Sequence, residues 1–207
     1  MKEYLTYIYD EKPSWDSVPK AEISCYQWEG SEKYRPEAYA KMCFVKDKGV
    51  YVLLMCSEEA PKTDCKSVND PVYHDSCLEM FLSFGQEGYL NIETNSAGVY
   101  LSEFGKTRGS RRFLSDITSE APTVTPQRVG AYWGNEIFFP NIIFKALYPD
   151  FDTVRPGTYR GNFYKCGDLT EIPHYGSFAP MGAFELGFHN PELFAYFIVK
   201  GRNENGK

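Results

Sequence analysis

A carboxylate stands in the middle of an alternating run of polar and apolar residues. Residues 73–82 read YHDSCLEMFL, with Glu79 near the centre. Side chains alternate between the two faces of a β-strand. If the apolar side chains at 78, 80 and 82 turn towards a core, Cys77, Glu79 and Phe81 face the opposite side. There Glu79 would meet water or accept hydrogen bonds from a polar ligand, so this strand carries a candidate binding site.

Aromatic residues are unusually abundant in the chain. They make up 16% of the 207 residues, with 16 Tyr, 15 Phe and 3 Trp. This exceeds what a core of this size needs, and tyrosine suits surfaces that must be both flat and polar. We therefore expect some rings to be exposed for contact with a ligand.

The elements that position these groups are predicted to be β-strands, because a period of two recurs between turn residues. Asp47-Lys48-Gly49 and residues 85–88 (GQEG) are hairpin signals, and only residues 141–148 have helical spacing, ended by Pro149. The predicted strands are 4–9, 22–28, 38–45, 50–57, 78–84, 89–94, 98–104, 126–133, 158–165 and 193–199. This pattern predicts an all-β fold, an antiparallel β-sandwich or jelly roll with one short helix. We expect one domain over residues 1–199 and a polar tail over 200–207.

Charge and composition exclude several classes of protein. The net charge of −6 argues against a nucleic-acid partner, and the arginines at 108, 111 and 112 are interpreted as a solvated loop. No stretch approaches the roughly 20 apolar residues of a membrane-spanning helix. The six cysteines form no metal or disulfide pattern, so free thiols are expected. With no secretion signal at its start, the sequence as written indicates a cytoplasmic protein, or an extracellular one if a leader was removed.

Four blocks in this sequence together resemble family 9 carbohydrate-binding modules. The first is Tyr73-x-Asp75-Ser76-x-x-Glu79-x-Phe81 followed by Tyr89-x-x-x-Glu93-x-Asn95-x-x-Gly98. The others are residues 160–165 (RGNFYK), 174–180 (HYGSFAP) and 188–194 (FHNPELF). With the segment 132–140, the similarity covers roughly residues 20–199. The resemblance implies a DOMON-like β-sandwich that binds sugar beside or within enzymes degrading plant polysaccharides such as cellulose and xylan, with glycoside hydrolases as its possible partners.

Members of this family hold the terminal sugars of a glycan between two aromatic rings. The resemblance assigns one wall to Tyr73 and the opposing wall to Phe178, both smaller than the tryptophan usual at these positions. Flat rings suit the C–H faces of a pyranose, and polar side chains suit its hydroxyl rim, where Glu79 would accept charge-assisted bonds. The candidate polar contacts beside Glu79 are Asn91, Asn95, Asn162 and His174. Phe178 could equally plug an end of the sandwich, and Asn95 could serve only a hairpin turn.

Other functions remain open at this stage. Glu79 with Glu93 or Asp75 could form an acid and base pair for glycoside hydrolysis. Histidine and methionine side chains could hold haem, as in some DOMON-like relatives. The domain could also have kept the sandwich for protein interactions and lost its sugar clasp. A structural calcium ion is possible, and the loop from Asp64 to Asp75 could hold it, although no metal ligand set can be read from the spacing.

Overall fold

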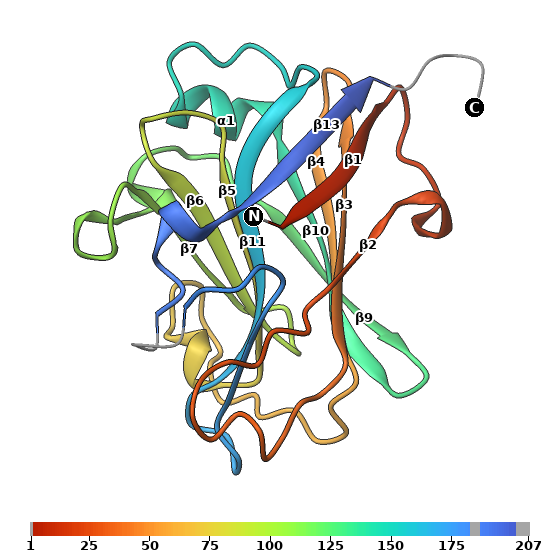
Figure 1. Ribbon diagram of the computed structural model, residues 1–207. Coiled ribbons are helices and arrows are strands. Elements are labelled where there is room, and N and C mark those ends of the chain that lie inside the picture. The colour runs from red at the N-terminus through yellow and green to blue at the C-terminus, as the bar shows by residue number, and fades with distance from the viewer. Residues whose placement is uncertain (1, 183–186, 202–207) are drawn as a thin grey trace.

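The computed structural model describes residues 2–182 and 187–201. In this part of the chain thirteen strands form one strongly curled sheet (Figure 1). They are β1 (Glu3–Tyr9), β2 (Lys20–Glu22), β3 (Ala38–Val45), β4 (Gly49–Cys56), β5 (Cys77–Ser83), β6 (Tyr89–Asn95), β7 (Tyr100–Gly105), β8 (Arg112–Phe113), β9 (Thr123–Val129), β10 (Tyr132–Pro140), β11 (Gly157–Gly167), β12 (His174–Ser177) and β13 (Ala195–Gly201).

The sheet folds over on itself to make a β-sandwich. The strand order is β8-β7-β6-β5-β11-β13-β1-β3-β4-β10-β9, with β12 beside β11 and β2 beside β3. Side chains of β5, β6 and β11 meet those of β3, β4 and β10 in the main hydrophobic core. The all-β sandwich predicted from the sequence is therefore confirmed.

Helices are few and short. The α-helix α1 (Asn141–Leu147) lies where helical spacing predicted it. The 3-10 turns are η1 (Trp15–Ser17), η2 (Val72–His74), η3 (Arg108–Ser110), η4 (Leu114–Asp116) and η5 (Pro191–Leu193). No helix in residues 2–182 and 187–201 is long and apolar enough to cross a membrane.

Most strands lie where the alternating pattern predicted them, and the predicted turns join them. Asp47 and Gly49 take φ angles of 56° and 153° between β3 and β4, and Gly88 takes 151° between β5 and β6. In the first turn a Cβ on Gly49 would lie 1.9 Å from the carbonyl oxygen of Phe139, so only glycine fits. Both hairpins are antiparallel.

Three details differ from the prediction. Strand β1 pairs in parallel with both β13 and β3, so the sheet is mixed rather than wholly antiparallel. The predicted strand at 126–133 is instead a hairpin of β9 and β10 that turns at Gly130, where φ is 58°. The predicted strand at 22–28 is reduced to the end of β2 and a single bridge at Cys25.

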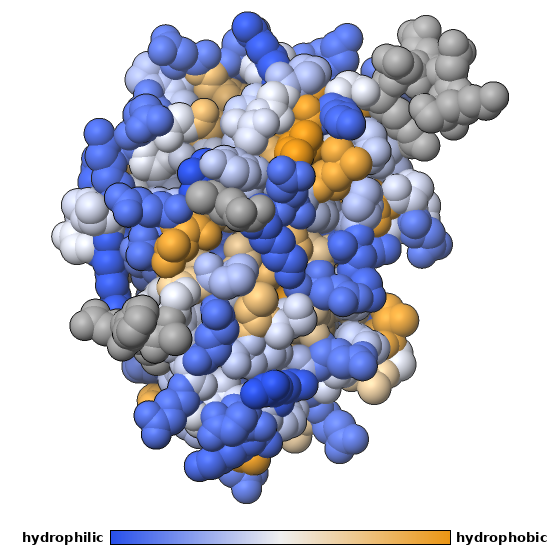
Figure 2. Space-filling view, in the orientation of Figure 1, coloured by the Kyte–Doolittle hydropathy of each residue, from blue (hydrophilic) through white to orange (hydrophobic). Residues whose placement is uncertain are grey.

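A second, smaller hydrophobic cluster lies on the outer face of β5, β6 and β11. It contains Cys77, Phe81, Tyr89 and Tyr164 and is covered by residues from the segment before β13, including Phe188. All six cysteines are free, as expected. Of the polar tail predicted at 200–207, residues 200 and 201 end β13, and the remainder lies outside the described residues. The face in Figure 2 is largely hydrophilic, with scattered hydrophobic patches.

Candidate functional site

The outer face of β5 carries the residues singled out in the sequence. Leu78, Met80 and Leu82 lie in the main core, whereas Cys77 and Phe81 lie in the outer cluster, so the predicted alternation is confirmed. In the register of β5 and β6, Glu79 stands directly opposite Glu93. Directly opposed residues of an antiparallel pair point to the same face. The two glutamates therefore lie side by side on the outer face.

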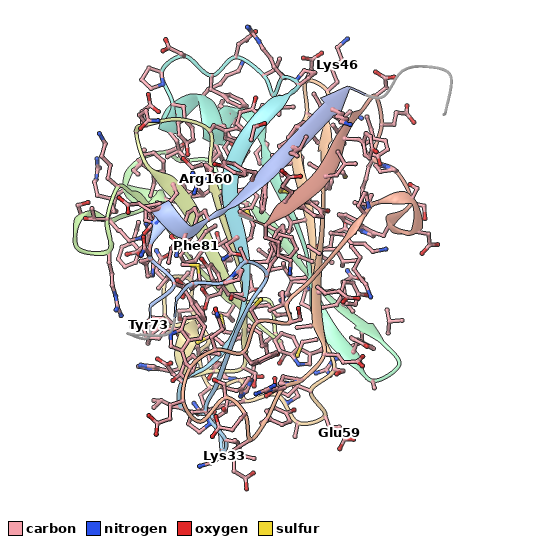
Figure 3. The ribbon with its side chains drawn as sticks, viewed as in Figure 1. Lys33, Lys46, Glu59, Tyr73, Phe81 and Arg160 are labelled. Atoms are coloured by element: carbon pink, nitrogen blue, oxygen red, sulfur yellow. The ribbon has the colours of Figure 1, made fainter. Side chains whose placement is uncertain are left out.

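A cavity of about 420 Å³ opens over this face. Its volume lies within the usual range of small-ligand pockets, about 300–1,000 Å³. Glu79 and Glu93 lie at its buried end, and Tyr73, Phe113 and Phe188 supply aromatic surface. Figure 3 labels Tyr73 below Phe81, on the side of the molecule that β5, β6 and β7 form. The cavity thus combines flat rings with a carboxylate pair.

The two carboxyl groups are buried and have few partners. Glu79 is 2% exposed and Glu93 is 4% exposed. Glu93 Oε1 accepts a hydrogen bond of 2.7 Å from Asn91 Nδ2, but Oε2 has no hydrogen-bond partner among the described residues. Burial, with a smaller contribution from the charge of Glu103, raises the pKa of Glu93 to about 7 against the effect of the Asn91 amide. Burial, followed by repulsion from Glu93, raises the pKa of Glu79 well above its ordinary value.

Arg111 lies beside the carboxyl pair and is held in a fixed position. Its side chain is 3% exposed, and its Nε donates to Glu103 Oε2 at 3.2 Å. Its Nη2 donates to the carbonyl oxygen of Glu103 and to Asn91 Oδ1, and its guanidinium lies 4.3 Å from the centre of the Tyr89 ring. Its Nη1 has no hydrogen-bond partner in the described part of the chain. The interpretation of the arginines as a solvated loop is therefore wrong for Arg111.

The arginine and the glutamate are joined through one amide. Asn91 accepts from Arg111 with its Oδ1 and donates to Glu93 with its Nδ2. Asn91 itself is fully buried and does not line the cavity. Its place in the structure is beneath the site, where it fixes the orientation of the two charged groups.

Tyr73 is held at the rim by backbone contacts. It lies in η2, its carbonyl oxygen accepts from the backbone N–H of Asp168 at 3.1 Å, and its side chain remains 37% exposed. The loop before it is anchored by the fully buried Asp75, which accepts from the backbone N–H groups of Asp64 and Cys65. Asp75 also accepts from Asn95 Nδ2 at 3.0 Å, which ties the loop to the end of β6. Exposed and fixed in place, the Tyr73 ring can contact a ligand.

Phe178 is not at the cavity. It is 4% exposed and packs in the main core, edge-on to Tyr4 and Phe163. Its backbone N–H bonds the carbonyl oxygen of Phe163, which turns the side chain inward. The structure therefore corrects the assignment of Phe178 as the opposing wall. Phe113, 37% exposed at β8, and Phe188, stacked on Tyr164, are the phenylalanines that line the cavity.

The remaining predicted polar contacts also lie away from the cavity lining. Asn95 Oδ1 accepts from the backbone N–H groups of Ala97 and Val99 in the turn after β6. Asn162 bonds the backbone of Ala179 in both directions. His174 is fully buried, with Nδ1 2.7 Å from the carbonyl oxygen of Ile172. Of the seven predicted site residues, Tyr73 and Glu79 are brought together at the cavity, and the other five are not.

The sequence analysis does not predict four of the residues that line the cavity. Arg108, Arg111 and Phe113 follow β7, and the two arginines belong to the trio that the sequence analysis interprets as a solvated loop. Glu93 was weighed only as one half of a catalytic pair. One signal in the sequence could have identified Glu93. The predicted hairpin at 85–88 places strand 89–94 beside strand 78–84, with Glu93 directly across from Glu79.

The loop from Asp64 to Asp75 does not fit a calcium ion. Asp75 accepts from two backbone N–H groups, from Asn95 and from Lys62 Nζ at 3.3 Å. Lys62 Nζ also lies 2.9 Å from Asp64 Oδ2, and Asp70 accepts from two further backbone N–H groups. Calcium needs about six to eight oxygen ligands. These oxygens already face N–H donors and a lysine ammonium.

One group of metal-ligating atoms occurs at the buried end of the cavity. Within the described ranges, Cys77 Sγ and carboxylate oxygens of Glu79 and Glu93 lie within 4.8 Å of one another. Burial raises the pKa of the Cys77 thiol well above its ordinary value, so the sulfur keeps its proton. One thiol and two carboxylates do not fit calcium either, since that ion prefers an all-oxygen shell.

Comparisons with known proteins decide the family of this chain. Residues 10–199 match the model of carbohydrate-binding family 9. The chain belongs to this family. No curated protein matches it. Membership agrees with the resemblance seen in the four sequence blocks, and the family is a non-catalytic, carbohydrate-binding one.

Solved structures share the fold of this family 9 module. A candidate carbohydrate-binding protein from Bacteroides uniformis is 21% identical, with a TM-score of 0.80 over 96% of this chain and 99% of the other. A family 9 module from Caldicellulosiruptor kristjanssonii in complex with glucose is 15% identical, with a TM-score of 0.67 over 99% and 98%. The same comparison with the cellotriose complex gives a TM-score of 0.67 at 15% identity over 100% and 97%.

Proposed function

We propose that this module binds sugar residues of a glycan in the cavity over β5 and β6. The observation that carries the proposal is a pair of buried polar atoms without hydrogen-bond partners among residues 2–182 and 187–201, Glu93 Oε2 and Arg111 Nη1, on two residues that line one cavity. Buried polar groups are normally hydrogen-bonded, and an unpaired one is costly. A sugar hydroxyl can donate to the carboxyl oxygen and accept from the guanidinium, so neighbouring hydroxyls suit both groups.

The aromatic surface of the cavity supports the same ligand. Tyr73 and Phe113 are each 37% exposed and line the cavity above the carboxyl pair. Aromatic faces pack well against the C–H faces of a pyranose, and the rim hydroxyls then point towards polar groups. We infer that these two rings, rather than Tyr73 and Phe178, contact the faces of the sugar.

The class of glycan is proposed from the family and its structural neighbours. Two of the neighbouring complexes hold glucose and cellotriose, which are sugars of the plant cell-wall type. We infer that this module recognises plant-type glycans such as cellulose or xylan fragments. Glycoside hydrolases that act on the same polysaccharides are then the proposed partners.

We infer further that the module is not an enzyme. Glycoside hydrolysis needs one protonated carboxyl and one ionised carboxylate on opposite sides of a bond. Here both candidate groups share one face of one hairpin, and burial raises the pKa of both. Release of reducing sugar by the purified protein, lost in Glu79→Gln, would contradict this inference.

Isothermal titration calorimetry tests the proposed function. Glucose, cellotriose and xylotriose are titrated into the protein, and we expect dissociation constants of roughly 10 to 1000 μM for at least one of them. Tyr73→Ala and Glu79→Gln are each expected to abolish measurable binding. Tyr132→Ala is the matched control, since that tyrosine begins β10 outside the cavity lining and bonds Glu37. Absence of binding by all three sugars would favour an interaction domain that has lost its sugar site.

A further inference from the structure

Acidic side chains outnumber basic ones among the described residues that line the cavity. Arg111 and Glu103 form an ion pair, and together they contribute no net charge. His189 also lines the cavity, but burial lowers its pKa to about 3, so it is neutral. The acidic groups that remain are Glu79, Glu93 and Asp168, against the exposed Arg108 at the rim.

No lysine or arginine within the described residues forms an ion pair with either buried carboxyl group, and Arg111 pairs with Glu103. The nearest buried lysine, Lys165, precedes Cys166 on β11 and pairs instead with Glu58 at 3.3 Å. Neighbouring residues of a strand point to opposite faces, so the Lys165 ammonium lies on the core side of the sheet. Glu79 and Glu93 therefore face the cavity without an ion pair in the described chain, although the charge of Arg111 opposes the rise in the pKa of Glu93.

The spacing of the pair suits a small cation with several hydrogen-bond donors. Carboxylate oxygens of Glu79 and Glu93 lie within 4.8 Å of each other. A charged N–H to carboxylate bond is about 2.7–2.9 Å between heavy atoms. Two oxygens no more than 4.8 Å apart can thus both bond one nitrogen between them. An ammonium group has three donors, and the unpartnered Glu93 Oε2 offers it an acceptor.

We propose that the site prefers a sugar that carries a protonated amino group, which would lie between Glu79 and Glu93. This proposal rests on the proposed sugar-binding function and deepens it by naming the class of sugar. A neutral hydroxyl would bind here mainly to protonated carboxyl groups. An ammonium instead favours the ionised carboxylates, and its charge-assisted bonds to them are roughly twice as strong as neutral ones.

Binding of an ammonium group to this pair releases protons. Glu93, whose pKa is about 7, is largely protonated in the free protein at pH 6, and a cation between the two glutamates favours the ionised forms. The other titratable or charged groups that face Glu93 are Tyr73, Cys77, Glu79, Glu103, Arg111, Cys166 and Asp168. Affinity for the amino sugar is therefore expected to rise with pH up to about 7.

The test compares glucosamine with glucose and with N-acetylglucosamine, whose nitrogen carries no charge. Calorimetric titrations at pH 6.5 are run in two buffers of different ionisation enthalpy. The amino group of glucosamine lies next to electron-withdrawing groups, as an α-amino group does. An α-amino group has a pKa of about 8, so we expect the amine of glucosamine to be protonated at pH 6.5. We expect glucosamine to bind at least tenfold more tightly than either neutral sugar, with a buffer-dependent enthalpy that shows proton release.

A variant ties the preference to the carboxyl pair. Glu93→Gln is expected to reduce the ratio of glucosamine to glucose affinity to about one. Glu136→Gln, on β10 and outside the cavity lining, is expected to keep the ratio of the unmodified protein. Equal affinities for glucose and glucosamine would overturn the amine proposal and leave the proposed function standing. Loss of binding in EDTA, restored by a divalent metal, would also overturn it, and no binding of any sugar would overturn both.

Discussion

Replacement of Glu93 by glutamine is predicted to stabilise the protein at neutral and alkaline pH. Burial raises the pKa of Glu93 from an ordinary 4.5 to about 7. Each pKa unit corresponds to about 1.4 kcal/mol, so ionising this group in the folded state costs about 3 kcal/mol. Glutamine keeps the shape of the side chain and an oxygen for the Asn91 amide, and it carries no charge.

The direction of the pH dependence follows from the sign of the pKa change. Because the folded protein holds the Glu93 proton more tightly than the unfolded chain, its free energy of unfolding falls as the pH rises from about 4.5 to about 7. The Glu93→Gln variant has no carboxyl group at this position, so this decrease in the free energy of unfolding does not occur in it. We therefore expect a gain close to zero at pH 4 and about 3 kcal/mol at pH 8, which is about 6 to 12 °C in Tm for a chain of this length.

The assay is urea denaturation followed by tryptophan fluorescence at pH 4 and pH 8, together with thermal melts. Glu103→Gln is the matched control. It also removes one negative charge from the cavity, but it leaves the buried Arg111 guanidinium without its carboxylate, so it is expected to destabilise the protein at pH 8. A Glu93→Gln variant that is no more stable than the unmodified protein at pH 8, or that gains equally at both pH values, would refute this reasoning.

Three further substitutions test the packing of the fold away from the cavity. Phe178→Ala should cost about 3–5 kcal/mol in urea denaturation because the ring fills the main core, and a cost below 1 kcal/mol would place the ring outside it. Lys165→Met should lower the free energy of unfolding by about 3–5 kcal/mol at pH 7, since Glu58 would lose its buried partner; a more stable variant would contradict the pairing. Gly134→Ala should prevent soluble expression, because its Cβ would lie 1.8 Å from the carbonyl oxygen of Leu54, and a folded variant with an unchanged Tm would argue against this register of β4 and β10.

Local patterns predicted those parts of the fold that depend on neighbouring residues. Alternation placed Glu79 on the outer face of β5, and the turn residues at 47–49 predicted the hairpin of β3 and β4. The parallel pairing of β1 with β13 and β3 joins segments that are distant in the sequence, and no local pattern specifies such pairing. The hairpin at Gly130 was missed because only one residue marks the turn.

The site was predictable to a smaller extent, for reasons that concern particular residues. Of the residues that line the cavity, Glu79 was predicted from its place in the middle of a clear strand pattern, and Tyr73 from its place in a family motif. Phe178 was assigned from its place in a family motif, but its backbone bond to Phe163 directs the ring into the core. Arg111 is surrounded by polar residues in the sequence, and its burial arises only when it packs over Tyr89 from the neighbouring strand β6.

A crystal structure of the protein soaked with cellotriose tests the central claim most directly. We predict density for a sugar ring in the cavity over β5 and β6, in contact with Tyr73 and with hydroxyls within hydrogen-bond distance of Glu93 Oε2 and Arg111 Nη1. A sugar bound on another face, or one in this cavity that leaves both of those atoms without a partner, would contradict the account.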